Sequence, residues 1–212
     1  MRYQRVPVGP FATNAVIIED ETTHDALLLD PGDSPELLLD RVRRLAVRVT
    51  RIVLTHGHLD HCLAAPRLAA ELSVPIAMHE ADVPLYRNLP VQARMLLGGA
   101  VPFAEADPGD PQELLKDGDR VRFGGVEAEV MHLPGHSPGG IGLLVRGSPS
   151  VLFCGDTIFR DGVGRTDLWG GDWETLLGSI RERIFTLPED TRLVCGHGPE
   201  TTVGREKRSF LF

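Results

Sequence analysis

The sequence predicts an α/β fold in which two β-sheets pack against each other and helices cover their outer faces. Short apolar runs of strand length occur in two groups, one before residue 80 and one after residue 120, and turn residues bound them. Helical patterns lie between these runs and after them. A chain of 212 residues is long enough to bury such a core, so we expect residues 1–212 to form a single domain.

The first group of runs predicts strands at 14–19, 26–29, 51–55 and 74–78. Residues 19–21 are the expected hairpin turn between the first two strands. A helix is expected after Ser34, its cap, because Pro35 suits the first helical turn. Its expected buried face consists of Leu37, Leu38 and Leu45. Pro66 similarly suits the first turn of a helix over 67–72.

The second group predicts strands at 121–123, 126–131, 141–145, 151–154 and 193–195. Gly124 and Gly125 form the expected turn of a hairpin between the first two of these strands. A helix is expected over 173–184 with Asp172 as its cap. Residues 88–117 are rich in Gly and Pro and have weak periodicity, so we expect a loop or lid there.

Bulk composition limits the classes of partner. The net charge of −8 argues against a nucleic-acid-binding surface, which usually carries many cations. No apolar run approaches the ~20 residues that span a bilayer, and no secretory signal is recognisable at the N-terminus. The three cysteines cannot all pair with one another, so we expect a reducing, cytoplasmic setting without a disulfide framework.

Four polar residues directly follow the predicted strand at 51–55, namely His56, His58, Asp60 and His61. Their side chains are therefore expected at the rim of the sheet. Imidazole and carboxylate groups suit zinc, iron and manganese, whereas structural zinc sites more often use paired cysteines. The alternative is an ordinary solvated loop, but three histidines within six positions rarely occur by chance.

Three further residues lie beside glycine at or near strand ends: His136, Asp156 and His197. Taken alone, His136 is more often a hydrogen-bonded turn histidine than a ligand, and Asp156 is more often a turn or cap residue. Together with the first four residues, they provide enough ligands for two metal ions.

The pattern His56-x-His58-x-Asp60-His61, followed by His136, Asp156 and His197, resembles the metallo-β-lactamase superfamily. The resemblance implies a four-layer αββα sandwich with two divalent metal ions at one edge of the sheets, zinc being expected and iron or manganese being alternatives. It implies one metal held by His56, His58 and His136. It implies a second metal held by Asp60, His61 and His197, with Asp156 bridging the two.

Such a centre predicts hydrolysis. Metal binding can lower the pKa of water to ~7 and so produce a bound hydroxide, while a metal also polarises the carbonyl under attack. The metals then stabilise the oxyanion that forms. Asp60 is the candidate catalytic residue, because its carboxylate could orient the hydroxide or transfer its proton.

Residues 155–167 resemble glyoxalase II and its short relatives, which implies a small-molecule thioester substrate such as S-lactoylglutathione or a related hydroxyacyl-thiol. The resemblance implies that Arg165 contacts the glycine carboxylate of glutathione. The alternative is an internal ion pair between Arg165 and Asp161 or Asp167. Gly198-Pro199 replaces a tyrosine found in glyoxalase II, and the tail resembles the short single-domain branch of that family.

Other functions remain as alternatives. Persulfide dioxygenases share the Gly-Arg-Thr-Asp element at 164–167, and there His56, His136 and Asp156 would hold a single iron. A phosphodiesterase or nuclease is less expected from the acidic charge, and a non-catalytic binding protein is least expected because no ligand position is lost. Cys62, Cys154 and Cys195 lie near the ligands and are expected to be buried structural thiols. The sequence leaves the oligomeric state open, a homodimer included.

Overall fold

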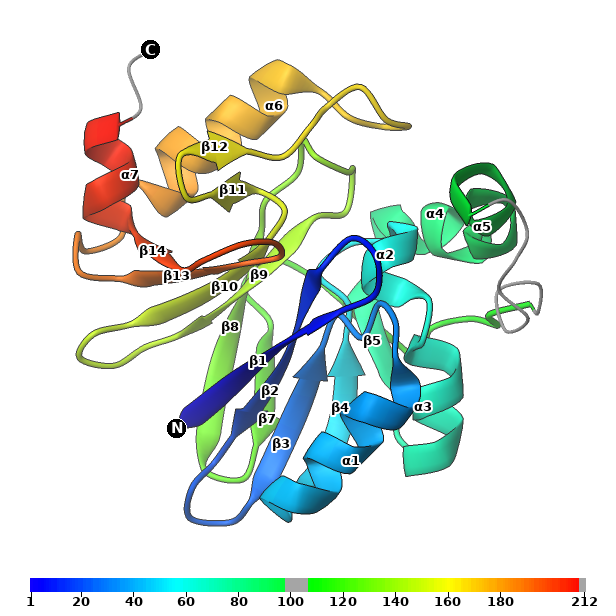
Figure 1. Ribbon diagram of the computed structural model, residues 1–212. Helices are drawn as coiled ribbons and strands as arrows, with labels where there is room; N and C mark the ends of the chain where they lie inside the picture. Colours follow the sequence, from blue (N-terminus) through cyan, green and yellow to red (C-terminus); the bar gives the residue numbers. More distant parts are fainter. Residues whose placement is uncertain (98–106, 210–212) are drawn as a thin grey trace.

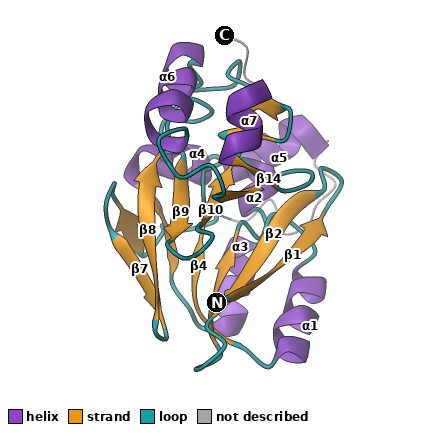
Figure 2. Ribbon diagram, turned by 90° about the vertical axis from the view of Figure 1, so that its left-hand side faces the viewer, coloured by secondary structure: helices purple, strands orange, loops and turns teal. Residues whose placement is uncertain are grey.

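The computed structural model describes residues 1–97 and 107–209 and contains two six-stranded sheets that pack face to face (Figure 1). Helices lie on the outer face of each sheet, so the chain forms helix, sheet, sheet and helix layers (Figure 2). The predicted four-layer αββα sandwich is therefore confirmed. Within the described residues, no helix combines the length and the apolar character that crossing a membrane requires.

The first sheet has the strand order β1-β2-β3-β4-β5-β6. Its strands are β1 (Arg2–Val8), β2 (Thr13–Glu19), β3 (Asp25–Leu29), β4 (Arg48–Val53), β5 (Ile76–His79) and β6 (Glu113–Leu115). The pairs from β1 to β3 are antiparallel and those from β3 to β6 are parallel. Its outer helices are α1 (Pro35–Leu45) and α3 (Ala65–Leu72).

The second sheet has the strand order β14-β13-β10-β9-β8-β7. Its strands are β7 (Arg120–Phe123), β8 (Val126–His132), β9 (Ile141–Val145), β10 (Val151–Gly155), β13 (Arg192–Cys195) and β14 (Thr201–Thr202). Only β10 and β13 pair in parallel within this sheet. Its outer helices are α6 (Trp173–Gly178), the π-helical segment Ser179–Ile184 that continues it, and α7 (Val203–Ser209).

Short elements lie between the strands along the chain. They are α2 (Leu59–Cys62), η1 (Glu80–Asp82), α4 (Val83–Arg87), α5 (Leu89–Leu97), β11 (Ile158–Phe159) and β12 (Gly162–Val163).

The apolar strands of the first sheet are buried on both faces. In β2, Val16 and Ile18 pack into the core between the sheets, whereas Ala15 and Ile17 pack toward the helices. Strands that are covered on both faces have near-continuous apolar sequences, and β2 and β3 show this pattern. Across the core, the rings of Tyr3 and Phe153 meet edge to face with their centroids 5.3 Å apart.

Several sequence predictions were wrong in detail. Ser34 makes no capping hydrogen bond, since its backbone adopts a left-handed conformation with φ of 53°. Leu37 is exposed, because the buried face of α1 follows helical spacing through Leu38, Leu39 and Val42. The expected loop at 88–117 contains α5 and β6, and its residues 98–106 lie outside the described part of the chain.

The buried carboxylate of Asp20 links a turn of the first sheet to a turn of the second sheet by hydrogen bonds. Asp20, between β2 and β3, accepts hydrogen bonds from the backbone N–H groups of Thr22 and Gly125 at 3.0 and 2.8 Å. Gly125 belongs to the turn between β7 and β8, in the opposite sheet. These backbone donors, together with the Thr23 hydroxyl, lower the pKa of Asp20 to about 2.

We expect Asp20→Ala to lower the melting temperature at pH 7, because the variant leaves the Gly125 N–H group without its acceptor. A carboxyl group whose pKa folding lowers stabilises the folded state above its unfolded pKa of ~4. That stabilisation disappears as the pH falls through the folded value of about 2. The difference in melting temperature between wild type and variant should therefore shrink between pH 4 and pH 2.

Asp40→Ala is the matched control, because Asp40 forms an exposed ion pair with Arg44 within α1. Such pairs contribute little to stability, so we expect little change at any pH. Equal melting temperatures for wild type and Asp20→Ala at pH 7 would contradict the assigned role.

Candidate metal centre

The predicted ligands come from segments at one edge of both sheets. His56, His58, Asp60 and His61 follow β4, Asp156 follows β10 and His197 follows β13. His136 lies in the connection between β8 and β9. Because β10 and β13 are parallel neighbours, their carboxyl ends place Asp156 and His197 side by side. The structure therefore brings all seven predicted ligands into one cluster.

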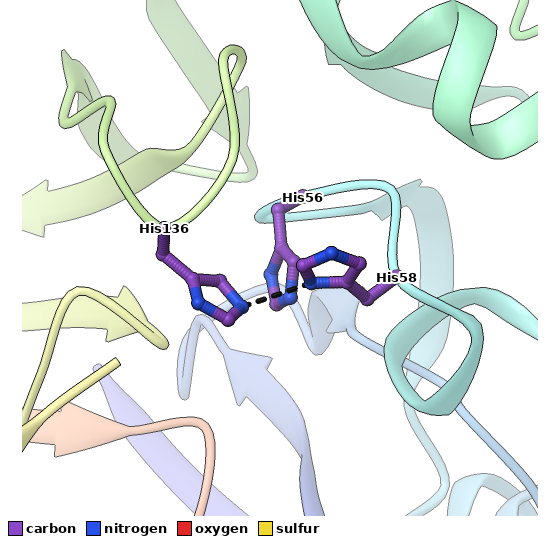
Figure 3. Close-up of side chains that lie close together, drawn as sticks. All are labelled: His56, His58 and His136. Carbon is purple, nitrogen blue, oxygen red and sulfur yellow. Dashed lines mark hydrogen bonds between the residues drawn. The ribbon is translucent and has the colours of Figure 1, made fainter. Parts of the chain in front are cut away.

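Three buried histidines form the first group of this cluster, which we call the three-histidine site: His56, His58 and His136. Their side chains point toward one another from two loops (Figure 3). His58 Nδ1 and His136 Nε2 lie 2.9 Å apart. Possible ligand atoms of all three residues lie within 4.8 Å of one another. This spacing is compatible with a single cation between three imidazoles.

A second group, which we call the Asp60 site, consists of Asp60, His61 and His197. His197 Nε2 lies 3.1 Å from Asp60 Oδ2 and 3.3 Å from His61 Nε2. His61 Nε2 lies 3.6 Å from the same carboxylate oxygen. Possible ligand atoms of this group also lie within 4.8 Å of one another.

Asp156 lies between the two groups. Its Oδ1 is 3.3 Å from His61 Nε2, and its Oδ2 is 3.4 Å from His197 Nε2 and 3.8 Å from His136 Nε2. A carboxylate in this position can reduce the repulsion between two cations.

The donor atoms fit metal ions. His56 Nε2 and Asp156 Oδ1 are buried and have no hydrogen-bond partner among the described residues. Leaving such groups unsatisfied costs about 1–3 kcal/mol each, and a cation bound between them would remove that cost. Five imidazoles and two carboxylates also match the ligand preferences of zinc, iron and manganese better than those of calcium or magnesium.

Asp30 orients histidines in both groups. It is buried at the end of β3 and accepts hydrogen bonds from Thr55 Oγ1 at 2.6 Å and from His61 Nδ1 at 2.9 Å. His56 Nδ1 in turn lies 3.1 Å from Thr55 Oγ1. These contacts leave the Nε2 atoms of His56 and His61 directed to the cluster, an arrangement that fixes metal-binding tautomers.

Asp30 was not predicted as a functional residue from the sequence. In the sequence, Asp30 is marked only by its position after an apolar strand. An aspartate is common there for another reason, because Pro31 and Gly32 predict a turn.

Backbone carbonyl groups orient two more histidines. His136 Nδ1 donates to the carbonyl oxygen of Arg165 at 2.7 Å, and His197 Nδ1 donates to that of Phe11 at 3.0 Å. In both residues the Nε2 atom is therefore the one left to bind a metal. Neither carbonyl group could be inferred from side-chain identity in the sequence.

Protonation differs between the two groups. Burial lowers the pKa of His58 to about 4, so this ring is neutral at pH 7 as a metal ligand must be. Burial alone would lower the pKa of His197, but hydrogen bonds to Asp156 and Asp60 raise it to about 9. Burial alone would raise the pKa of Asp60, but the nearby imidazoles of His61 and His197 outweigh this effect and lower the pKa to about 2. In the Asp60 site, one carboxylate with a lowered pKa therefore faces two imidazoles with raised pKa values, so a cation would compete with protons there.

Arg165 forms an exposed bidentate ion pair with Asp167, with both N–O distances at 2.7 Å. Asp161, the other suggested partner, instead contacts Arg205 at 2.7 Å. The predicted contact between Arg165 and a substrate carboxylate is not tested by this arrangement and stays a prediction. All three cysteines are free and buried, as expected for structural thiols.

Known proteins resemble this chain over most or all of its length. The profile of the metallo-β-lactamase superfamily matches residues 8–197. A hydroxyacylglutathione hydrolase, GloC of Haemophilus influenzae, is 38% identical over 213 residues, covering 100% of this chain and 98% of GloC.

Solved structures also resemble the chain closely. BLEG-1, described as a B3 metallo-β-lactamase, has a TM-score of 0.89 and 33% identity over 98% of this chain and 97% of its own. TTHA1623 in a di-iron-bound form has a TM-score of 0.86 and 39% identity over 97% of this chain and 98% of its own. ETHE1 from Myxococcus xanthus is less similar, with a TM-score of 0.76 and 26% identity over 99% and 83% of the two chains. The chain belongs to the metallo-β-lactamase superfamily.

Proposed function

We propose that the protein is a metallo-hydrolase that cleaves thioesters between a hydroxyacyl group and a small thiol, with S-lactoylglutathione as the representative substrate. The observation that carries the proposal is the cluster of two ligand groups with Asp156 between them. The full-length similarity to GloC, a hydroxyacylglutathione hydrolase, supports the choice of substrate class.

We infer a centre of two divalent ions, zinc in the first instance, in which Asp156 bridges the three-histidine site and the Asp60 site. Iron and manganese suit the same ligands, and the di-iron form of TTHA1623 supports iron as the main alternative. When bound, such ions lower the pKa of water toward ~7 and polarise a carbonyl group. The three buried free cysteines support a reducing, cytoplasmic setting.

Asp60 is the residue that we propose handles the proton of the attacking water. Its Oδ2 accepts a hydrogen bond from Thr13 Oγ1 at 3.1 Å and lies 3.1 Å from His197 Nε2, so the carboxylate is held at the edge of the cluster. Its pKa of about 2 keeps it ionised at pH 7 and able to accept a hydrogen bond. Hydrolysis then adds water across the acyl carbon–sulfur bond and returns one proton to the departing thiolate.

A persulfide dioxygenase is the second candidate. In that case His56, His136 and Asp156 would hold a single iron with positions open for oxygen. Asp156 Oδ2 does lie 3.8 Å from His136 Nε2, and the Gly-Arg-Thr-Asp element at 164–167, which persulfide dioxygenases share, supports this alternative. The ligand residues alone do not distinguish the two, and we favour the hydrolase because GloC is 38% identical over the whole of this chain.

The decisive experiment combines metal analysis with three assays on one purified preparation. The substrates are S-lactoylglutathione, glutathione persulfide with measurement of oxygen uptake, and a chromogenic β-lactam. We expect two metals per chain and turnover of the thioester only. One iron per chain with oxygen uptake would replace the proposal with the dioxygenase, and turnover of the β-lactam alone would also overturn it.

Asp60→Asn is expected to lower kcat for the thioester by ~10²–10⁴, the range typical of a lost general acid or base. Metal content should be measured on the same samples, because Asp60 is also a candidate ligand. Asp190→Asn, at an exposed position, is the control and should leave kcat unchanged. Full turnover together with full metal occupancy in Asp60→Asn would exclude the assigned role.

Arg165→Met is expected to raise KM for S-lactoylglutathione about tenfold, because a charged hydrogen bond to the glycine carboxylate is lost. The exposed pair with Asp167 should open readily to allow this contact. The comparison substrate is S-lactoyl-N-acetylcysteamine, which lacks that carboxylate and whose KM should not change. An equal rise in KM for both substrates would show that Arg165 acts on the loop rather than on glutathione.

A further inference from the structure

Asp82 is a fully buried carboxylate that belongs to neither ligand group. It ends the short helix η1, directly after β5. Its Oδ2 accepts hydrogen bonds from the Gly57 N–H group at 2.8 Å and from Ser137 Oγ at 2.7 Å. Its Oδ1 accepts one from the Gly139 N–H group at 2.6 Å.

These three donors come from the two loops that carry the three-histidine site. Gly57 separates His56 from His58, while Ser137 and Gly139 follow His136. Asp82 therefore forms hydrogen bonds with both loops from a third segment of the chain. Direct contacts between the loops include the 2.9 Å contact between His58 and His136 and the rings of His56 and His136, whose centroids lie 4.8 Å apart. Nearby, the Ile141 N–H group donates a hydrogen bond to the Thr55 carbonyl oxygen.

Both loops also approach the backbone of Asp82 through a glycine. A Cβ atom on Gly57 would lie 2.9 Å from the Asp82 carbonyl oxygen, and one on Gly139 would lie 2.6 Å from the Asp82 nitrogen. Contacts this short exclude a side chain at either position. The two loops are therefore packed directly on Asp82 and do not merely reach it through long side chains.

We propose that Asp82 is a positioning residue that sets the separation of the two loops and thereby the metal affinity of the three-histidine site. This inference rests on the proposed metal centre and not on the identity of the substrate. A carboxylate suits the position because two of the three groups facing it, both backbone N–H groups, can only donate. Asparagine cannot satisfy both, since either orientation of its amide turns an NH₂ group toward at least one of them.

The Asp60 site depends on different contacts. His61 is held by Asp30, His197 by the Phe11 carbonyl group and Asp60 by Thr13. None of these bonds involves Asp82. A change at Asp82 should therefore weaken one half of the centre and leave the other half in place.

The test measures zinc affinity by chelator competition in two backgrounds. The first carries His61→Ala and His197→Ala and keeps the three-histidine site. The second carries His58→Ala and His136→Ala and keeps the Asp60 site. We expect Asp82→Asn to weaken zinc binding by about 10–100-fold in the first background, the range seen when groups that orient metal ligands are removed. In the second background we expect a change of less than about threefold.

Ser137→Ala is a milder variant that removes one of the three hydrogen bonds. It keeps the test valid if Asp82→Asn fails to fold, and it should weaken zinc binding only in the first background. Thr13→Val is the matched control, since it removes a hydrogen bond to Asp60 and should leave the three-histidine site unchanged.

Unchanged affinity for both Asp82→Asn and Ser137→Ala in the first background would overturn the proposal. Equal losses in both backgrounds would also overturn it, because they would indicate general destabilisation. If the first background binds no zinc even with Asp82 intact, the three-histidine site itself is excluded and the metal centre fails with it. Thioester turnover is not part of this readout, so an error in the substrate would not be mistaken for an error about Asp82.

Discussion

The structure depends on holding five imidazoles and two carboxylates together in a place that is largely closed to water. Such groups repel one another or lose solvation when they are buried, and each unsatisfied atom costs free energy. Two features offset this cost here. Asp156 lies 3.3 Å from His61 Nε2 and 3.4 Å from His197 Nε2, so its negative charge faces the two imidazoles whose pKa values are raised. The converging nitrogens and oxygens provide a cation site that would satisfy the rest. The two packed sheets supply the rigid edge that holds these side chains together.

Several segments that are distant in sequence contribute to that edge. The β1–β2 turn supplies the Phe11 carbonyl group, Asp30 directly follows β3, and the segment after β5 supplies Asp82. The loop at Arg165 fixes His136 through a backbone carbonyl. A metal centre in this fold is therefore set by the global arrangement of strands. The histidine-rich segment after β4 provides only part of it.

The sequence predicted those features that are local. Apolar runs covered on both faces identified most strands, and the spacing of His56, His58, Asp60 and His61 identified the ligand loop. Strand β1 was missed because it is an edge strand with many half-exposed polar residues. Asp30 and Asp82 were missed because each bonds groups distant in sequence, and a single aspartate beside turn residues has no pattern that distinguishes it. The sequence was likewise compatible both with an ion pair between Arg165 and Asp167 and with a contact between Arg165 and a substrate, and it did not distinguish the two.

The exposure of the ligands indicates how a substrate reaches them. The side chains of Asp60 and His197 are 22% and 27% exposed, whereas that of His61 is completely buried. The open side of the cluster is therefore that of Asp60 and His197, and Phe11 and Phe159 lie beside it: Phe11 is 43% exposed, and the ring of Phe159 is 6.0 Å from that of His197. Asp82 packs behind the three-histidine site, which is deeply buried. Under the proposed function, substrate would therefore be recognised at the exposed side of the cluster, while the buried bonds of Asp82 would govern metal affinity. Changes in substrate preference could then arise without disturbing the bonds that hold the three histidines.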